Sequence, residues 1–252
     1  MGSSNISIKH LVIAIIVMAI FFYAGYGLVN DKAKENTIPT REEVLKKSLL
    51  FEAMNILDPV KADEFYKMLY STSLNEDGTI NDEILSKFLL SVRAWFENNL
   101  GNIFMHASDE SVNEYGKHSL NVLNTLLDSD PTGVYCFNVL YPGVLGNFDI
   151  PKLKEDTKKL TYKGSYLISI AESINQKVKV DRLPVEQVKE VISSINEKMA
   201  EKYGDAYYIE DPQELAKQPS LECNTRRDFY KHVMELDTHL SAEVIRYLHK
   251  PE

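Results

Sequence analysis

The feature that most constrains this chain is an uncharged, apolar stretch from Leu11 to Val29, flanked by Lys9 and Asp31. A helix over this stretch is roughly 28 Å long at about 1.5 Å of rise per residue, close to the hydrocarbon thickness of a bilayer. We therefore expect a transmembrane anchor at 11–29. The prediction divides the chain into a short tail (1–10), the anchor (11–29), a polar linker (30–39) and a helical soluble domain (40–252).

Two other interpretations of the stretch stay open. It is longer than the apolar core of a secretory signal peptide, yet Gly25-Tyr26-Gly27 provides a small-x-small triplet where a cleavage site would fall. A buried helix of a soluble protein is the third interpretation. The aromatic residues Phe21–Tyr23 and Tyr26 favour the anchor, because such rings are enriched at the membrane interface.

The charges beside the anchor do not fix its orientation. Lys9 precedes it, whereas Lys32, Lys34 and Arg41 follow it, which would keep the large domain in the cytoplasm. Long domains, however, are translocated largely regardless of flanking charge. A short tail before a single anchor is also the usual arrangement of a protein whose C-terminal domain is exported. We expect an extracytoplasmic domain, periplasmic if the source is bacterial.

The composition is that of a globular protein, with 44% hydrophobic and 26% charged residues. A net charge of −9 argues against general nucleic-acid binding, which needs a basic face. Beyond the anchor there is enough chain for a large core without a disulfide framework. We therefore expect no nucleic-acid partner.

Periodic apolar residues and capping signals predict an all-α fold resembling a helix bundle. Between the helices, residues 129–151 are rich in proline and glycine but also in apolar residues, which indicates a packed connection between two halves, with a short helix after Pro131. The expected helices cover residues 40–57, 59–70, 81–100, 108–127, 164–176, 181–203 and 224–249.

Residues 73–84 resemble the calcium loop of an EF-hand, with Asn75 and Asp77 at the third and fifth ligand positions. The resemblance covers this loop alone. Ser73 stands where an aspartate is expected, and Ile84 stands where a bidentate glutamate is expected. An ordinary turn followed by a helix cap explains the same residues, so we expect no calcium site.

A second metal-like pattern is His232, Glu235 and His239, which share one face if a single helix covers 224–249. The two histidines would then be two turns apart, roughly 10 Å, too far for one zinc ion. Only Glu235 and His239 have ligand spacing, and two ligands make no site. A solvated polar stripe is the favoured interpretation, and we expect neither a metal nor a cofactor.

The chain has two cysteines, Cys136 and Cys223. In an oxidising compartment they can form one long-range disulfide, whereas in a cytoplasm two unrelated buried thiols are expected. Cys223 with His232 could also suggest a thiol nucleophile and its base, but Glu222 beside the cysteine would raise a thiol pKa. No catalytic motif is present, and we assign no catalytic residue.

These observations favour a membrane-anchored, non-enzymatic helical domain that acts through protein contacts in a cell-envelope assembly. Its expected partners are the bilayer, through residues 11–29, and other envelope proteins. The aromatic residues of the irregular segments belong to types enriched at interfaces: Tyr135, Phe137, Tyr141, Tyr207 and Tyr208. An extracytoplasmic ligand-binding or sensory domain is the alternative, and an enzyme with an unrecognised site is third.

Overall fold

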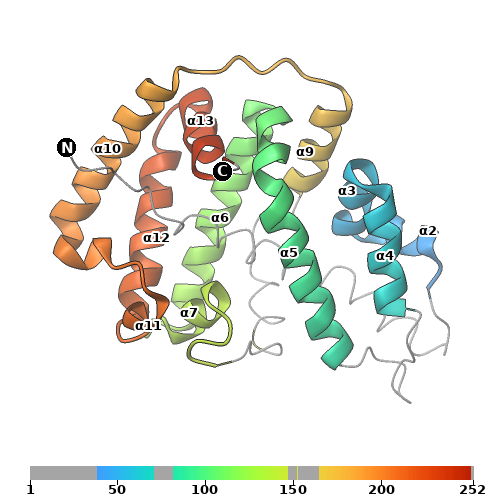
Figure 1. Ribbon diagram of the computed structural model, residues 1–252, viewed down its shortest axis with the longest axis horizontal. Coiled ribbons are helices and arrows are strands. Elements are labelled where there is room, and N and C mark those ends of the chain that lie inside the picture. The colour runs from blue at the N-terminus through green and yellow to red at the C-terminus, as the bar shows by residue number, and fades with distance from the viewer. Residues whose placement is uncertain (1–38, 71–81, 147–151, 153–164, 251–252) are drawn as a thin grey trace.

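The computed structural model describes residues 39–70, 82–146, 152 and 165–250. These residues form α-helices and short 3₁₀ turns, with no strand among them, so the all-α prediction is confirmed for the described part of the chain. Figure 1 shows the helices gathered around α6 (Asp109–Ser129), which runs through the middle of the molecule.

The first helices follow the capping signals, with one correction. Thr40 and Glu43 form the predicted capping box at the start of α2 (Arg41–Lys47). The single helix expected over 40–57 is wrong, because Ser48 adopts an extended conformation and α3 (Leu49–Leu57) begins after it. Leu50, Ala53 and Met54 of α3 are buried in the core. Helix α4 (Pro59–Tyr70) follows as predicted.

Helix α5 (Asp82–His106) is longer than expected. The sequence predicted an end at Gly101, but the helix continues through that glycine for another turn, with Ile103 and Phe104 buried. Burial of these side chains outweighs the low helix propensity of one glycine, about 1 kcal/mol. Helix α6 then starts at the predicted cap, where the Ser108 hydroxyl accepts a hydrogen bond from the Ser111 amide.

A short helix after Pro131 is present as predicted, namely α7 (Val134–Leu140). Helix α9 (Ser165–Asn175) and the long outer helix α10 (Val185–Tyr203) also match their predicted positions. An extended segment crosses from α9 to α10 in Figure 1. The 3₁₀ helix η2 (Gly204–Tyr208) and the short α11 (Pro212–Leu215) follow.

The single last helix expected over 224–249 is also wrong. The structure divides it into α12 (Pro219–Met234) and α13 (Thr238–Leu248). Asp237 begins the second helix by accepting a hydrogen bond from the Leu240 amide. The apolar spacing continues across the break, because α12 and α13 both pack against α6. Because the apolar periodicity is unbroken, the sequence did not predict the turn between α12 and α13.

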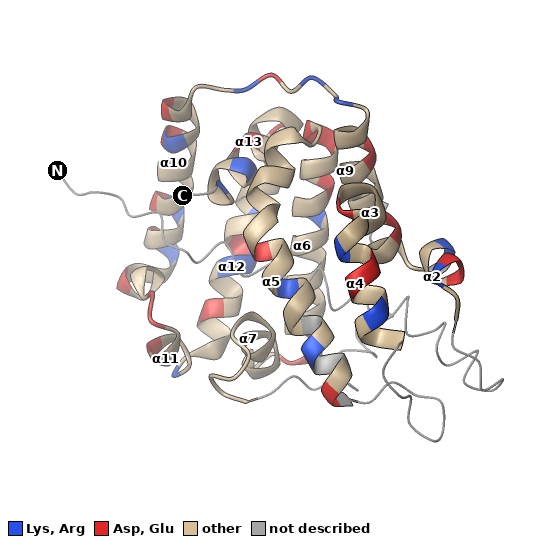
Figure 2. Ribbon diagram, turned by 45° about the vertical axis from the view of Figure 1, so that its right-hand side comes forward, with Lys and Arg blue, Asp and Glu red and all other residues tan. Residues whose placement is uncertain are grey.

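The core surrounds α6. Helices α12 and α13 pack on it from one direction, α9 also contacts it, and α3 packs in turn on α9. Helix α10 lies outside, against α12 and α13. Its predicted apolar face is confirmed, since Val188, Ile192, Ile195 and Met199 are all buried. Figure 2 shows charges of both signs along α10 and none on α7.

Among the described residues, none of the helices has the length and apolar composition needed to cross a membrane. The expected anchor at 11–29 lies outside the described residues, as do the tail and most of the linker.

Candidate functional site

The structure does not bring the metal-like residues of the sequence together. Asn75 and Asp77 lie outside the described residues. Glu235 ends α12, where its carboxylate is 3.1 Å from Nδ1 of His232, at the surface. His239 belongs to α13, and its Nδ1 lies 2.6 Å from Oδ2 of Asp109. The shared helix face expected for these residues is therefore wrong, because the chain turns between them.

The two cysteines are joined by a disulfide bond that links α7 to α12. Both residues are fully buried, at 0% exposure. Next to them, Gly133 precedes α7 with a φ of 74°, and a Cβ there would lie 2.4 Å from Cα of Ser220. The starts of α7 and α12 are thus in backbone contact where the disulfide joins them.

One group of charged side chains centres on Arg246, which is 0% exposed. Its guanidinium donates hydrogen bonds to the carbonyl oxygens of Phe104 and Ala107, at 2.9 and 2.7 Å. It also binds Oδ1 of Asp109 at 2.6 Å and Oε1 of Glu243 at 2.7 Å. Arg246 therefore occupies the free carbonyls at the end of α5 and the first residue of α6, and it fixes the corner between these helices.

Two further side chains, Arg182 and His239, reach this group from the surface. Nε of Arg182, in the extended segment before α10, donates to both oxygens of Glu243, at 2.7 and 3.0 Å. His239 contacts the second oxygen of Asp109. Each carboxylate of the Arg246 group is thus shared between a buried arginine and a more exposed partner. We call Arg182, Asp109, His239, Glu243 and Arg246 the corner network.

A separate buried pair lies on α12. Nε of Arg226 donates to Oε1 of Glu222 at 2.5 Å, and both side chains are buried. The hydroxyl of Tyr141, after α7, lies 2.8 Å from Glu222 and 2.5 Å from Nη2 of Arg226. Burial raises the pKa of Tyr141 to about 12, so the phenol stays protonated and donates to the carboxylate. This triad connects the end of α7 to α12, near the disulfide.

Asp228, also on α12, accepts hydrogen bonds from Lys202 and from the Tyr203 hydroxyl, both at the end of α10. Arg227 binds its other oxygen at 2.9 Å. Burial alone would raise the pKa of Asp228, but these three donors outweigh it and lower the pKa to about 2. The carboxylate therefore stays ionised and holds α10 on α12.

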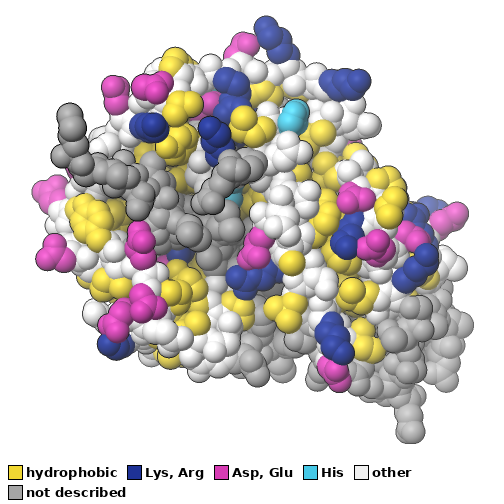
Figure 3. Space-filling view, in the orientation of Figure 1, with side chains coloured by type: hydrophobic (Ala, Val, Ile, Leu, Met, Phe, Trp, Pro, Cys, Tyr) yellow, Lys and Arg dark blue, Asp and Glu magenta, His cyan; other side chains and the backbone are white. Residues whose placement is uncertain are grey.

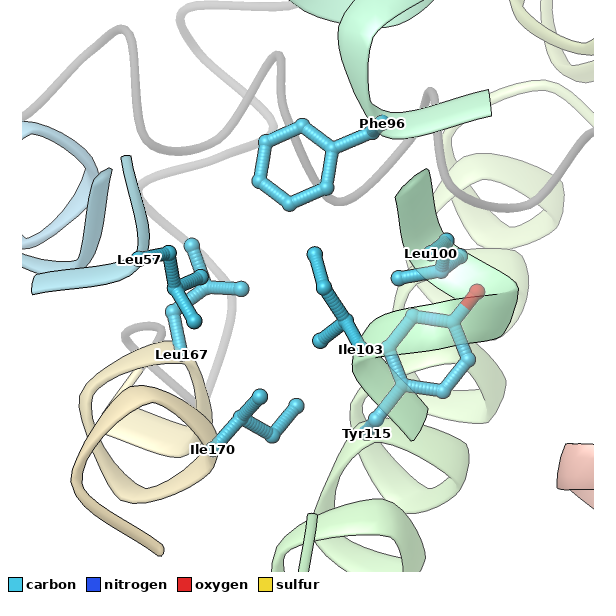
Figure 4. Close-up of a pocket in the computed structure, with 7 residues that line it drawn as sticks. All are labelled: Leu57, Phe96, Leu100, Ile103, Tyr115, Leu167 and Ile170. Atoms are coloured by element: carbon cyan, nitrogen blue, oxygen red, sulfur yellow. The ribbon is translucent and has the colours of Figure 1, made fainter. Parts of the chain in front are cut away.

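An apolar cavity lies between α3, α5, α6 and α9 (Figure 4), and the side chains that line it point toward one another. Its free volume is about 10 Å³, roughly what one water molecule needs. This cavity has no room for an organic ligand, so it does not favour the ligand-binding alternative. The lining residues are Leu57, Phe96, Leu100, Ile103, Tyr115, Leu167 and Ile170.

Neither the corner network nor the Glu222–Arg226 pair was predicted from the sequence. A signal was present for each. Arg246 interrupts the apolar run Val244–Leu248, where a charge would be costly unless it were bonded. Glu222 and Arg226 have the i, i+4 spacing of a helical ion pair. Asp109 and Arg182 could not be found this way, because they come from distant parts of the chain.

Comparisons of the chain with protein-family models, with curated proteins and with solved structures gave no match.

Proposed function

We propose that this protein is a membrane-anchored, non-enzymatic helical domain that faces an extracytoplasmic space and acts through protein contacts in a cell-envelope assembly. The proposal combines the apolar stretch Leu11–Val29 with the folded helical domain that follows it. The single observation that carries it is the buried disulfide between Cys136 and Cys223. Disulfides form and persist in oxidising compartments and are rare in the cytosol, so the bond favours export of the domain.

The buried charges support a structural role over a catalytic one. Arg246 and Arg226 are held by carboxylates, and Arg246 also binds carbonyl oxygens at a helix end. These bonds explain the buried charges by a role in stabilising the fold. Solvent-accessible nucleophiles or bases with unusual pKa values, by contrast, are typical of active sites.

The proposed protein contacts are best sought at Tyr208. Of the five aromatic residues singled out in the irregular segments, Tyr135 and Phe137 are buried in the core, whereas Tyr208 is 61% exposed at the end of η2. Exposed tyrosine is a residue type enriched at protein interfaces. The acidic side chains of Asp205 and Glu210 are exposed on either side of it in the sequence, which favours a basic partner surface. Figure 3 shows hydrophobic side chains dispersed among charges of both signs on one face of the molecule.

The location is tested with a reporter thiol on the exposed face of α10. The full-length chain carries Cys136→Ala, Cys223→Ala and Ser193→Cys, and intact cells receive a membrane-impermeant maleimide. Labelling without lysis is expected. Labelling only after lysis would place the domain in the cytoplasm and overturn the proposal. Acid-quenched alkylation of the native chain gives a second readout, since a disulfide leaves no thiol to alkylate before reduction.

The contact role is tested by replacing Tyr208 with a photo-crosslinking phenylalanine derivative in the membrane-anchored chain. Irradiation of cells is expected to yield a discrete adduct with another envelope protein. The matched control carries the same derivative at Ser194, an exposed residue of α10. Equal adducts from both positions, or none from position 208, would count against a specific contact at η2.

A further inference from the structure

The end of α13 carries a buried histidine that belongs to none of the charge groups described above. His249 is 3% exposed and caps the C-terminus of the helix. Its ring meets Phe104 of α5 edge-on at 5.2 Å and Tyr115 of α6 edge-on at 5.8 Å, measured between ring centroids. Neither ring nitrogen is within hydrogen-bond reach of a partner among the described residues. The imidazole is therefore held as an apolar ring.

None of the charged groups that the structure describes around this ring is free to pair with a positive charge on the imidazole and so offset the cost of burying it. On its own helix, Arg246 is one turn away and is itself cationic, with both of its carboxylates in use. Glu243 already binds two arginines, and Asp109 of α6 binds Arg246 and His239. The titratable group that α6 presents to the ring is Tyr115, a phenol whose pKa burial raises well above its usual value. From α5 the contact is the hydrocarbon ring of Phe104.

We propose that His249 is an acid-sensitive latch: protonation of its ring releases the C-terminal turn of α13 from its place against α5 and α6. A charged imidazole packed against two aromatic rings, with a buried arginine one turn earlier, must reach water, and His249 stands at the C-cap of α13, directly before exposed Lys250. The shortest way to water is to unwind the last turn. The Arg246 bonds lie one turn earlier and keep the rest of α13 in place.

The direction of the effect follows from linkage. Burial lowers the pKa of His249 from 6.5 to about 4, so the docked state excludes a proton that the released state binds. Docking is therefore strongest above pH 6.5 and weakens as the pH falls from 6.5 toward 4. Between pH 7.5 and pH 5 the equilibrium between docked and released turn should shift about 30-fold toward release. This inference does not depend on the proposed function.

The experiment is hydrogen exchange on the full-length chain in detergent micelles, at pH 7.5 and pH 5, after correction for intrinsic rates. Protection at residues 247–250 is expected to fall about 30-fold at pH 5, while α6 and α12 keep theirs. His249→Phe, which retains a ring but no titratable nitrogen, should abolish that difference. His232→Gln, at a partly exposed histidine of α12, should behave as the wild type. An equal loss of protection in His249→Phe would overturn the proposal, as would a loss spread evenly over all helices.

Nuclear magnetic resonance of the native chain gives a readout that needs no variant at position 249. The Cε1 proton of His249 is expected to titrate well below pH 6 in the folded protein. A normal titration of His249 in the folded protein would overturn the latch even if His249→Phe failed to fold.

Discussion

Nη1 of Arg246 lies 2.7 Å from Oε1 of Glu243, and both side chains are buried, at 0% and 1% exposure. Removing two charges from water costs several kcal/mol for each ion, which one contact rarely repays. Here the cost is offset because Arg246 also binds Asp109 and two carbonyl oxygens at the end of α5. The ion pair therefore helps to hold α5, α6 and α13 together, and its contribution to stability depends on the whole corner network.

Arg246→Met keeps the volume of the side chain but removes all four interactions of the guanidinium. It leaves the carbonyl oxygens at the end of α5 without a donor, and Glu243 and Asp109 with only their exposed partners. We expect the free energy of unfolding to fall by about 3–5 kcal/mol. Urea denaturation of the full-length chain followed by circular dichroism measures this. Lys87→Ala, at an exposed ion pair on α5, is the control and should cost less than about 0.5 kcal/mol. Similar losses in both variants would contradict the role given to Arg246.

The disulfide should contribute strongly to stability because it closes a long loop. Cys136 and Cys223 are separated by 87 positions in the sequence. On the chain-entropy model such a loop stabilises the folded state by about 4–5 kcal/mol. The free energy of unfolding of the double variant Cys136→Ala, Cys223→Ala, measured without reductant, should therefore be lower than that of the wild type by about this amount. With reductant, the wild type should approach the double variant. A wild type whose unfolding is the same with and without reductant, while the variant is weaker, would show that cavity formation and not the bond is responsible.

Gly133 allows α7 and α12 to approach each other beside the disulfide. Gly133→Ala introduces a Cβ at 2.4 Å from the backbone of Ser220 and places alanine at a φ of 74°. The left-handed conformation alone costs about 1–2 kcal/mol, and the clash with backbone adds to it. Gly143→Ala is a matched control, because Gly143 also has a positive φ, 89°, but none of the described residues has an atom within 4 Å of its Cβ position. The thermal unfolding midpoint of Gly133→Ala should be clearly lower than that of Gly143→Ala. Equal midpoints would contradict the close approach of α7 and α12.

The sequence predicted the class of fold and most helix positions because these depend on local signals. The capping box at Thr40 and the apolar face of α10 are examples. The breaks at Ser48 and before Asp237 escaped prediction, because the apolar spacing continues across each of them and only tertiary packing decides the turn. The corner network was not predicted for a different reason, namely that Arg182, Asp109 and Arg246 meet only after folding. The shared-face prediction for Glu235 and His239 failed together with the single helix on which it depended.

Asp228 provides a pH dependence that is distinct from that of His249. Its pKa is about 2 in the folded protein and 3.8 ordinarily, so folding is favoured while the carboxylate is ionised. Its contribution to stability, about 2 kcal/mol, is present above roughly pH 4 and is lost as the pH falls from 4 toward 2. Asp228→Asn should therefore be less stable by about this amount at pH 7 and should show a flatter loss of stability below pH 4. Chemical denaturation at intervals of half a pH unit measures both effects.

Asp205→Asn, at an exposed aspartate near the end of α10, should follow the wild-type curve within about 0.5 kcal/mol. If Asp228→Asn lost stability at pH 7 but kept the full wild-type slope below pH 4, the three donors would stabilise α12 by hydrogen bonding alone, and the ionised state of Asp228 would not be what holds α10 in place.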